Sequence, residues 1–341
     1  MAAARSDPAG HPGAERAPLL EVRDLAVRFG AVRALSGVSF DVGRGEFFGV
    51  VGESGSGKSV TARAVLGLLG ATAEVSGSIR YDGEEILGAT PQRLRQLRGD
   101  AIGLVFQDAL AALDPVYTIG DQLVEAARAH RRISRREARD RAVALLDEVG
   151  IPDPAARLDA YPHQLSGGQR QRAVIASALI ADPQLIIADE PTTALDVTVQ
   201  KQILALLRRI RDTRGASIVL ITHDLGVIAQ TCDRVAVFYG GVIVEEAPVV
   251  SLFTEPLHPY TSALLGSVPR LGDPTPTSPI PGNPIQLRED LDACPFAPRC
   301  LHAVEVCTEA VPPEVHVAAR RHRCLRPWEP TEIRAAAVVR S

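Results

Sequence analysis

Apolar and polar residues follow one another along this chain in segments that predict a layered α/β fold. The stretch Leu20–Arg23 alternates apolar and polar residues, which is typical of a strand with one buried face. Later runs are almost continuously apolar, which is typical of strands buried on both faces of a sheet. The buried strands predicted are residues 46–51, 185–188, 218–221 and 235–238, and the helices beside them are residues 60–69 and 170–180. This order predicts an α/β core with an antiparallel portion at its start.

The two ends of the chain differ from this core. Residues 1–18 are rich in Ala, Pro and Gly, and we expect a disordered leader there. Fifteen of the 25 prolines lie between Pro248 and Pro330, so the tail should be rich in loops and held by something other than a large core.

Charge and hydropathy exclude several functions. The net charge of -4 and pI near 6.1 give no basic surface for nucleic acid. Acidic residues interrupt the arginine-rich stretch Arg131–Arg141, which favours a solvated helix face. No run approaches the roughly 18 apolar residues that span a bilayer, and the first residues lack the apolar centre of a signal peptide. We therefore expect a cytosolic protein whose contact with a membrane comes through a partner.

A glycine-rich loop after the first buried strand predicts a phosphate-binding site. Its residues are Gly52, Glu53, Ser54, Gly55, Ser56, Gly57, Lys58 and Ser59, and Val60 continues into the predicted helix. The first and last glycines allow a tight turn that points backbone N–H groups at an anion, and the helix N-terminus adds positive potential. At this spacing the lysine reaches the β- and γ-phosphates of ATP, and the serine hydroxyl serves Mg²⁺. Lys58 is one of only two lysines beside 35 arginines, which argues against a scattered surface cation.

Two further groups of residues accompany this loop. Ser166, Gly167, Gly168 and Gln169 precede a predicted helix, where they suit either anion binding or an ordinary N-cap. The buried strand 185–188 ends in Asp189 and Glu190 at the edge of the sheet where phosphates bind. Asp189 suits a role at Mg²⁺, and Glu190 suits polarising an attacking water.

Together these residues resemble the ATP-binding cassette (ABC) family, over nearly all of residues 19–265. The resemblance implies a P-loop ATPase with a RecA-like core, an antiparallel β-subdomain and a helical signature subdomain at about residues 108–180. It also implies that Phe29 stacks on adenine, although a core phenylalanine would look the same. It gives Gln107 a place near Mg²⁺ and the attacking water, makes Asp196 part of the D-loop, and makes His223 the switch residue that contacts the γ-phosphate.

In this family the signature segment of one subunit covers the ATP held by another subunit, so a complete site needs two chains. ATP closes the dimer, and hydrolysis at Glu190 opens it. The resemblance favours a heterodimer with a second, homologous ATPase, while a homodimer would also have two complete sites.

Less universal residues indicate the branch of the family. Residues 107–120 and the later sequence His258–Leu265 look like segments of the importers of oligopeptides, dipeptides and nickel. The resemblance implies two transmembrane permease subunits, an extracytoplasmic solute-binding protein, and a location at the cytoplasmic face of the membrane. Residues 108–122 are the predicted docking surface for a permease, or a packed connector to the helical subdomain. Nickel import is the alternative, and a non-transport ABC ATPase is less favoured because the chain has neither a second cassette nor a long coiled-coil insertion.

Four of the five cysteines lie in the last 48 residues, within a predicted extension over residues 266–341. A reducing cytosol disfavours disulfides, and the gaps of five, six and sixteen residues are wide for a zinc knuckle. The segment Cys294–Cys300 looks like the cysteine-bearing extension of peptide-importer ATPases, which is associated with a four-iron four-sulfur (4Fe–4S) cluster. The expected ligands are Cys294, Cys300, Cys307 and Cys324, with Zn²⁺ as the alternative metal and unligated or otherwise paired cysteines as the third alternative. The expected role is to staple the proline-rich tail, with a redox or metal sensor as a secondary role.

Overall fold

The structure is a computed structural model that describes residues 17–193, 195–267, 280–285 and 291–326. Almost all of the expected leader, residues 1–18, and part of the tail lie outside the described residues. Within that described part of the chain, no helix is both long enough and apolar enough to cross a bilayer.

The main sheet carries the loops that form the site. Its strand order is β11-β12-β10-β9-β3-β8-β7-β6, where β10 is Val242–Pro248, β11 is Val315–Val317 and β12 is Arg320–His322. The five strands from β9 to β6 are parallel. These five are β3 (Phe47–Gly52), β6 (Ile102–Val105), β7 (Leu185–Asp189), β8 (Ser217–Thr222) and β9 (Arg234–Tyr239). Every residue of β3, β7 and β8 is buried, as their apolar runs predict. Because parallel strands end at the same edge, the loops after β3, β6, β7 and β8 meet there.

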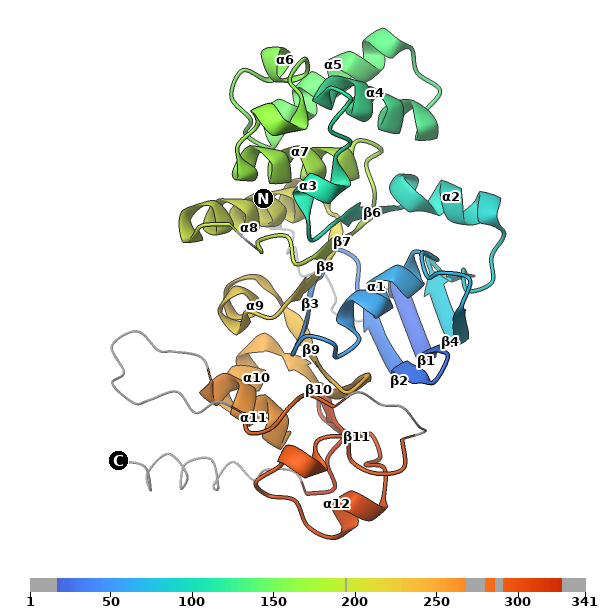
Figure 1. Ribbon diagram of the computed structural model, residues 1–341, viewed down its shortest axis with the longest axis vertical. Coiled ribbons are helices and arrows are strands. Elements are labelled where there is room, and N and C mark those ends of the chain that lie inside the picture. Colours follow the sequence, from blue (N-terminus) through green and yellow to red (C-terminus); the bar gives the residue numbers. More distant parts are fainter. Residues whose placement is uncertain (1–16, 194, 268–279, 286–290, 327–341) are drawn as a thin grey trace, which may run out of the picture.

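A second, antiparallel sheet of order β2-β1-β4-β5 lies beside the main sheet (Figure 1). Its strands are β1 (Leu20–Phe29), β2 (Val32–Val42), β4 (Ala73–Tyr81) and β5 (Glu84–Glu85), and the helices nearby are α1 (Lys58–Val65) and α2 (Pro91–Asp100). Apolar residues of α1 and of both sheets form one continuous core. The helix predicted over residues 60–69 is shorter in the structure, because Leu66 is the C-cap of α1 and Gly67 takes a left-handed conformation.

Helices α3 to α7 lie between β6 and β7 in sequence and form the upper part of Figure 1. They are α3 (Ala109–Ala112), α4 (Ile119–His130), α5 (Arg135–Glu148), α6 (Pro154–Arg157) and α7 (Gly167–Leu179), with the 3₁₀ turn η1 (Pro162–Gln164). The long α8 (Val197–Arg214) packs beneath them, and its apolar side joins their core.

The arginine-rich stretch 131–141 is not one helix face. Helix α4 ends at His130, and α5 begins only after Ser134, whose side chain forms a capping box with Glu137. Arg131 and Arg141 reach back to the backbone carbonyl groups of residues 181 and 180, at 2.7 and 2.6 Å. The predicted solvated face is therefore partly wrong, since these two guanidinium groups anchor the helical layer to the end of α7.

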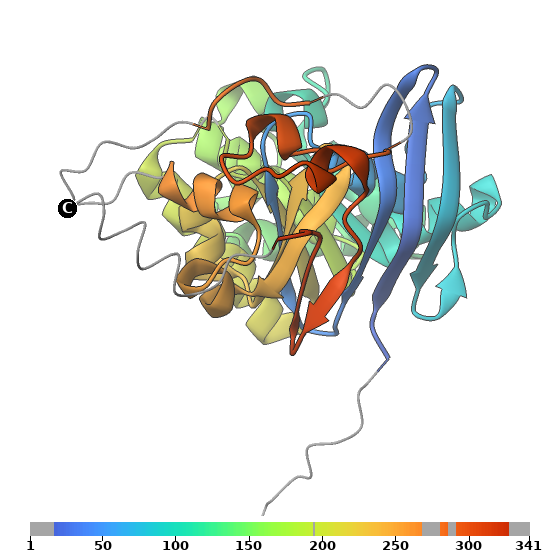
Figure 2. The same ribbon diagram turned by 90° about the horizontal axis from the view of Figure 1, so that it is seen from below.

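The described part of the tail packs against the β10 edge of the main sheet, in the lower part of Figure 1, and Figure 2 shows it from below. Its elements are η2 (Ala297–Arg299), α12 (Val306–Glu309), β11 (Val315–Val317) and β12 (Arg320–His322), and they follow α9 (Leu225–Thr231), β10 (Val242–Pro248), α10 (Val249–Thr254) and α11 (Pro259–Gly266). Strand β12 pairs with β10, and Phe296 packs its ring against Tyr239 and Tyr260 with centroids 5.2 and 5.3 Å away. The tail thus shares a core with β9, β10 and α11.

Candidate functional site

The loop between β3 and α1 has the backbone conformation that its glycines predict. Gly52 has φ near +154°, and a Cβ atom there would lie 2.2 Å from the carbonyl oxygen of Phe238. Gly57 has φ near +103° and is the N-cap of α1, and a Cβ atom there would lie 2.5 Å from Cδ2 of Leu35. Only glycine fits either position. Ser54 and Gly55 are exposed between them, so the loop presents its backbone to solvent at the start of a helix.

Lys58 is held inside this loop. Its Nζ donates hydrogen bonds to the carbonyl oxygens of Gly52 and Glu53, each at 2.8 Å, and the residue is 5% exposed. Burial lowers the pKa of Lys58, and the nearby carboxylates of Glu190 and Asp189 oppose that effect. The ammonium group is therefore held by oxygen atoms at the centre of the loop, where it can exchange carbonyl oxygens for phosphate oxygens.

Ser59 and Asp189 place two hard oxygen donors side by side. The Ser59 hydroxyl donates a hydrogen bond of 3.0 Å to Oδ1 of Asp189, across the gap between α1 and the end of β7. Burial raises the pKa of Asp189, and its hydrogen bond to Ser59 opposes this. A hydroxyl and a carboxylate in contact beside a phosphate-binding loop are the donor set that Mg²⁺ accepts, so the residues fit this ion.

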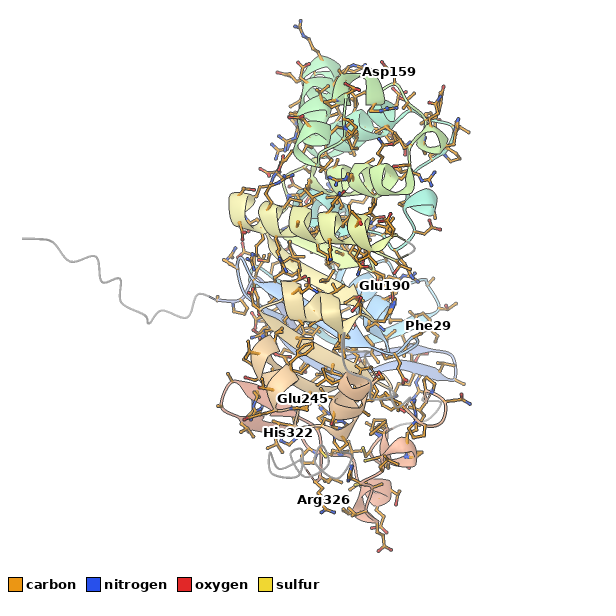
Figure 3. All side chains as sticks on the ribbon, turned by 90° about the vertical axis from the view of Figure 1, so that its left-hand side faces the viewer. Phe29, Asp159, Glu190, Glu245, His322 and Arg326 are labelled. Carbon is orange, nitrogen blue, oxygen red and sulfur yellow. The ribbon has the colours of Figure 1, made fainter. Side chains whose placement is uncertain are left out.

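Glu190 follows β7 in a left-handed conformation (φ near +48°) and receives three polar neighbours. Nε2 of Gln107 and Oγ1 of Thr193 donate to its Oε2 at 3.1 and 2.8 Å, and Nδ1 of His223 lies 3.3 Å from its Oε1. The loops after β6, β7 and β8 thus meet at the Glu190 carboxylate. Figure 3 shows Glu190 midway along the molecule, between Asp159 in the helical layer and His322 in the tail.

Thr193 was missed by the sequence analysis. Its hydroxyl fixes one oxygen of Glu190 from only three residues further on. The signal was present in the sequence, because a threonine soon after a predicted catalytic carboxylate can close a short turn back onto it.

The signature segment forms the N-terminus of α7. Ser166 caps the helix, and Gln169 completes a reciprocal capping box with it. A Cβ atom on Gly168 would lie 2.8 Å from Val199 of α8, so this close packing requires a small residue. Asp196 caps α8 and accepts hydrogen bonds from the N–H groups of residues 198 and 199, at 3.0 Å each. The structure therefore brings the signature and Asp196 together as two capped helix starts.

Phe29 and Val60 lie on the antiparallel side of the site. Phe29 ends β1, where it pairs with Val32 and Ala73, and its half-buried side chain packs partly against the core of that sheet. Val60 on α1 is half-buried against the same core. Core packing thus accounts for part of the Phe29 surface and leaves the remainder open to a ligand.

This arrangement defines a P-loop nucleoside triphosphatase. A phosphate loop with a buried lysine, a serine–aspartate pair and a fixed carboxylate lie at one edge of a parallel sheet.

Comparison with known proteins identifies the family. Residues 35–193 match the family model described as ABC transporter, and residues 244–307 match the oligopeptide/dipeptide transporter C-terminal region. The chain is 50% identical to a probable peptide ABC transporter ATP-binding protein of Sinorhizobium fredii, over 86% of this chain and 90% of that protein. It is 45% identical to an oligopeptide transport ATP-binding protein of Salmonella typhimurium, over 91% and 94%.

A third relative is longer than this chain. The oligopeptide transport ATP-binding protein of Mycobacterium tuberculosis is 52% identical over 91% of this chain, which spans 52% of that protein's length. Among solved structures, a dimeric ATP-binding cassette in a post-hydrolysis state with ADP and phosphate matches with a TM-score of 0.61 and 30% identity, over 67% of this chain and 98% of that one. The chain belongs to the ATP-binding proteins of ABC transporters that carry the oligopeptide/dipeptide C-terminal region. The family predicted from the sequence is confirmed.

The predicted iron–sulfur site in the tail is wrong. Among the side chains that the structure describes, no three His, Cys, Asp or Glu residues form a group that could hold a metal ion. This finding overturns the 4Fe–4S cluster and gives no support to Zn²⁺. Cys294, Cys300, Cys307 and Cys324 are all free thiols.

Packing explains why these cysteines gather. All four line one pocket of about 20 Å³, whose walls also include Phe296. Burial raises the pKa of Cys294 and Cys300, and raises that of Cys324 to about 12. Protonated thiols of this kind behave as small apolar side chains, so the cysteines fill the centre of a tail with little other apolar mass.

Proposed function

We propose that this chain binds and hydrolyses ATP to power the import of oligopeptides or dipeptides across a membrane. The observation that carries the proposal is the convergence of Lys58, Ser59, Asp189 and Glu190, with Gln107 and His223, at one edge of the main sheet. The peptide as cargo is supported by the names of the relatives and by the C-terminal family match.

Each residue has a role in hydrolysis that follows from its place. The N–H groups of the loop Gly52–Ser59 and the ammonium of Lys58 bind the phosphates of ATP. Ser59 and Asp189, with the Gln107 amide nearby, would hold Mg²⁺, which offsets negative charge on the β- and γ-phosphates.

Glu190 is the proposed general base for the attacking water. Its hydrogen bonds from Gln107 and Thr193 fix one carboxylate oxygen, and the other, 3.3 Å from Nδ1 of the exposed His223, is the proposed proton acceptor. General-base catalysis of this kind typically contributes about 10²- to 10⁴-fold in rate. His223 then senses the γ-phosphate, and Phe29 stacks on the adenine.

A second chain would complete the site. Ser166 and Gln169 cap the N-terminus of α7, and we propose that the positive end of this helix faces the γ-phosphate held by another subunit. We infer a heterodimer with a second, homologous ATPase, with Asp196 at the contact between the subunits. The isolated chain should hydrolyse ATP slowly and its complex faster. A stable homodimer that already turns over at the rate of the complex would contradict the heterodimer.

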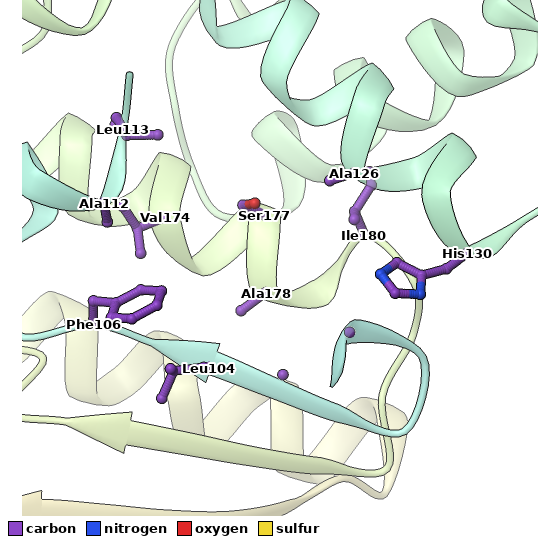
Figure 4. Close-up of a pocket in the computed structure, with 12 residues that line it drawn as sticks. Leu104, Phe106, Ala112, Leu113, Ala126, His130, Val174, Ser177, Ala178 and Ile180 are labelled. Carbon is purple, nitrogen blue, oxygen red and sulfur yellow. The ribbon is translucent and has the colours of Figure 1, made fainter. Parts of the chain in front are cut away.

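A pocket in the helical layer is the proposed docking site for a permease helix (Figure 4). Its volume is about 210 Å³, and it lies between β6, α3, α4 and α7, with Phe106 and Leu113 in its wall. Val116 and Tyr117 follow within the predicted docking segment 108–122 and are 71% and 56% exposed. Exposed apolar side chains in the segment that follows Leu113 of the pocket wall suit an apolar helix of a membrane partner.

The division of the chain follows from these roles. We propose that residues 19–265 form the nucleotide-binding domain, with residues 108–180 as its helical subdomain, and that residues 266–341 form the C-terminal extension. The proposed assembly has two permease subunits and lies at the cytoplasmic face of the membrane. An extracytoplasmic solute-binding protein delivers the peptide.

A transport assay tests the proposal. The chain would be co-expressed with two candidate permeases, a second ATPase and a solute-binding protein from the same organism, and the complex reconstituted in vesicles. We expect ATP hydrolysis to rise when peptide-loaded binding protein is added, and labelled peptide to accumulate. Accumulation of Ni²⁺ instead would favour the alternative cargo, and hydrolysis that responds to neither would contradict import by this chain.

A further inference from the structure

The C-terminal extension reaches the phosphate loop through one ion pair. Arg299 in η2 directs its guanidinium at Glu53, the second residue of the loop, although 246 positions separate them. Nη1 lies 2.6 Å from Oε2, and Nη2 lies 3.1 Å from Oε1, so the contact is a two-pronged fork. The Arg299 side chain is 6% exposed and that of Glu53 is 23% exposed, so solvent screens this pair less than a surface pair.

The remaining donors of Arg299 fix its position. Nε donates to the carbonyl oxygen of Pro281 at 2.7 Å, and Nη1 donates to Oη of Tyr239 at 3.2 Å. The guanidinium also lies over the Tyr239 ring, 5.7 Å from its centroid. Both the extension and the end of β9 therefore hold the fork in place before it meets Glu53.

Glu53 is also held through its backbone. Its N–H donates to Oη of the buried Tyr260 at 3.0 Å, and its carbonyl oxygen accepts from Nζ of Lys58 at 2.8 Å. The same carbonyl accepts from the N–H of Ser56 at 3.2 Å. The first turn of the phosphate loop is thus tied on one side to the catalytic lysine and on the other to the extension and α11.

We propose that Arg299 is a positioning residue for ATP binding, and that the extension is part of the wall of the nucleotide site. It acts in two ways. The fork orients the first turn of the loop, and its positive charge neutralises a carboxylate that stands beside a site for a highly charged anion. Without Arg299, the Glu53 carboxylate would repel the phosphates of ATP and compete for Lys58.

This mechanism differs from simple structural support in one measurable way. If Arg299 only held the fold together, removing Glu53 as well could not restore binding. If Arg299 neutralises Glu53, the Arg299 variant should regain much of its lost affinity for ATP when Glu53 is also replaced by a neutral residue. The inference rests on the proposed function, since it concerns the same nucleotide site.

The test is a set of ATP titrations on the full chain, using a fluorescent ATP analogue, with ATPase kinetics of the complex. We expect Arg299→Gln to raise the Kd and KM for ATP about tenfold and to leave kcat within about twofold, because the Glu190 cluster is untouched. Arg299→Lys keeps the charge without the fork and should raise Kd about threefold. The Kd of the double variant Glu53→Gln/Arg299→Gln should be within about threefold of the parent's Kd.

Arg321→Gln is the matched control. Arg321 is also an ion-paired arginine of the extension, half-buried, but it pairs with Glu246 and Glu314 rather than with the loop, so its replacement should leave Kd within about twofold. If Arg299→Gln does not fold, as judged by circular dichroism, Arg299→Lys and the double variant carry the test. A parent that does not bind ATP would refute the proposed function. A parent that binds, with Arg299→Gln equally tight or the double variant weaker than the single one, would refute only this inference.

Discussion

His223 and Glu190 meet at the ends of two neighbouring parallel strands, with Nδ1 of the histidine 3.3 Å from Oε1 of the glutamate. The sheet creates this contact, since Asp189 of β7 pairs with Ile221 of β8 and each functional residue follows its strand. The His223 side chain is 60% exposed, whereas that of Glu190 is 15% exposed. The histidine is therefore the solvent-facing partner of this pair, and the carboxylate is the more buried one.

Replacing Glu190 by glutamine should separate binding from hydrolysis. Glu190→Gln keeps the size of the side chain and removes the proton acceptor, so we expect turnover to fall by about 10²- to 10⁴-fold with the Kd for ATP within a few-fold of the parent. Phosphate release and nucleotide titration measure the two effects. Glu309→Gln, an exposed carboxylate of the extension, is the control. Turnover within a few-fold of the parent would remove Glu190 from this role.

The two lysines of the chain offer a matched comparison. Lys58→Arg places a larger, planar cation in a space where Nζ now lies 2.8 Å from two carbonyl oxygens, so we expect ATP affinity to fall at least about tenfold. Lys201→Arg on the exposed side of α8 should leave it unchanged. Isothermal titration with ATP and Mg²⁺ measures both. Equal affinities for the two variants would contradict the proposed contact with the phosphates.

The docking proposal predicts a loss of assembly without a loss of ATP binding. Val116→Asp adds a charge to a residue that is 71% exposed, and burial of that charge under an apolar helix would be unfavourable. We expect co-purification with the permeases to fall several-fold. Val250→Asp on α10 is the control, because Val250 is 75% exposed and lies on another face. If both variants co-purify like the parent, the permease docks elsewhere.

Acid should destabilise the protein partly through His258. This residue caps α11, where its Nδ1 accepts from the N–H of Tyr260, and burial lowers its pKa to about 3. An unfolded histidine titrates near 6.5, so the native state binds fewer protons between these values. Protonation of His258 therefore does not reduce the free energy of unfolding above about pH 6.5. Below that pH the free energy of unfolding falls, by up to about 1.4 kcal/mol per pH unit, until the pH reaches about 3.

His258→Asn removes this titration and keeps a capping oxygen. Urea unfolding from pH 7.5 to 4.5 should show a shallower loss of stability below pH 6.5 than in the parent. His163→Asn, which replaces an exposed histidine, should follow the parent's slope. A His258→Asn variant with the parent's pH dependence would show that His258 is not the group responsible.

The sequence by itself determined the family and named the residues of the candidate nucleotide site. Lys58, Ser59, Asp189 and Glu190 could be found because each lies at a set distance from a buried strand, and parallel strands bring their ends to one edge. The left-handed turns at Gly52 and Gly57 also depend on local backbone geometry, which glycine spacing reveals. Short-range rules of this kind act before the rest of the chain is placed.

Only the tertiary structure decided what the extension contacts. Arg299 meets Glu53 because the tail folds back over β9, and no spacing in the sequence predicts a contact across 246 positions. The four tail cysteines suggested a metal site by their clustering, yet the fold packs their thiols into a space of about 20 Å³. Long-range packing and burial determine both the Arg299–Glu53 pair and the packing of the thiols. The role of a thiol or a guanidinium group depends on the groups that the fold brings beside it.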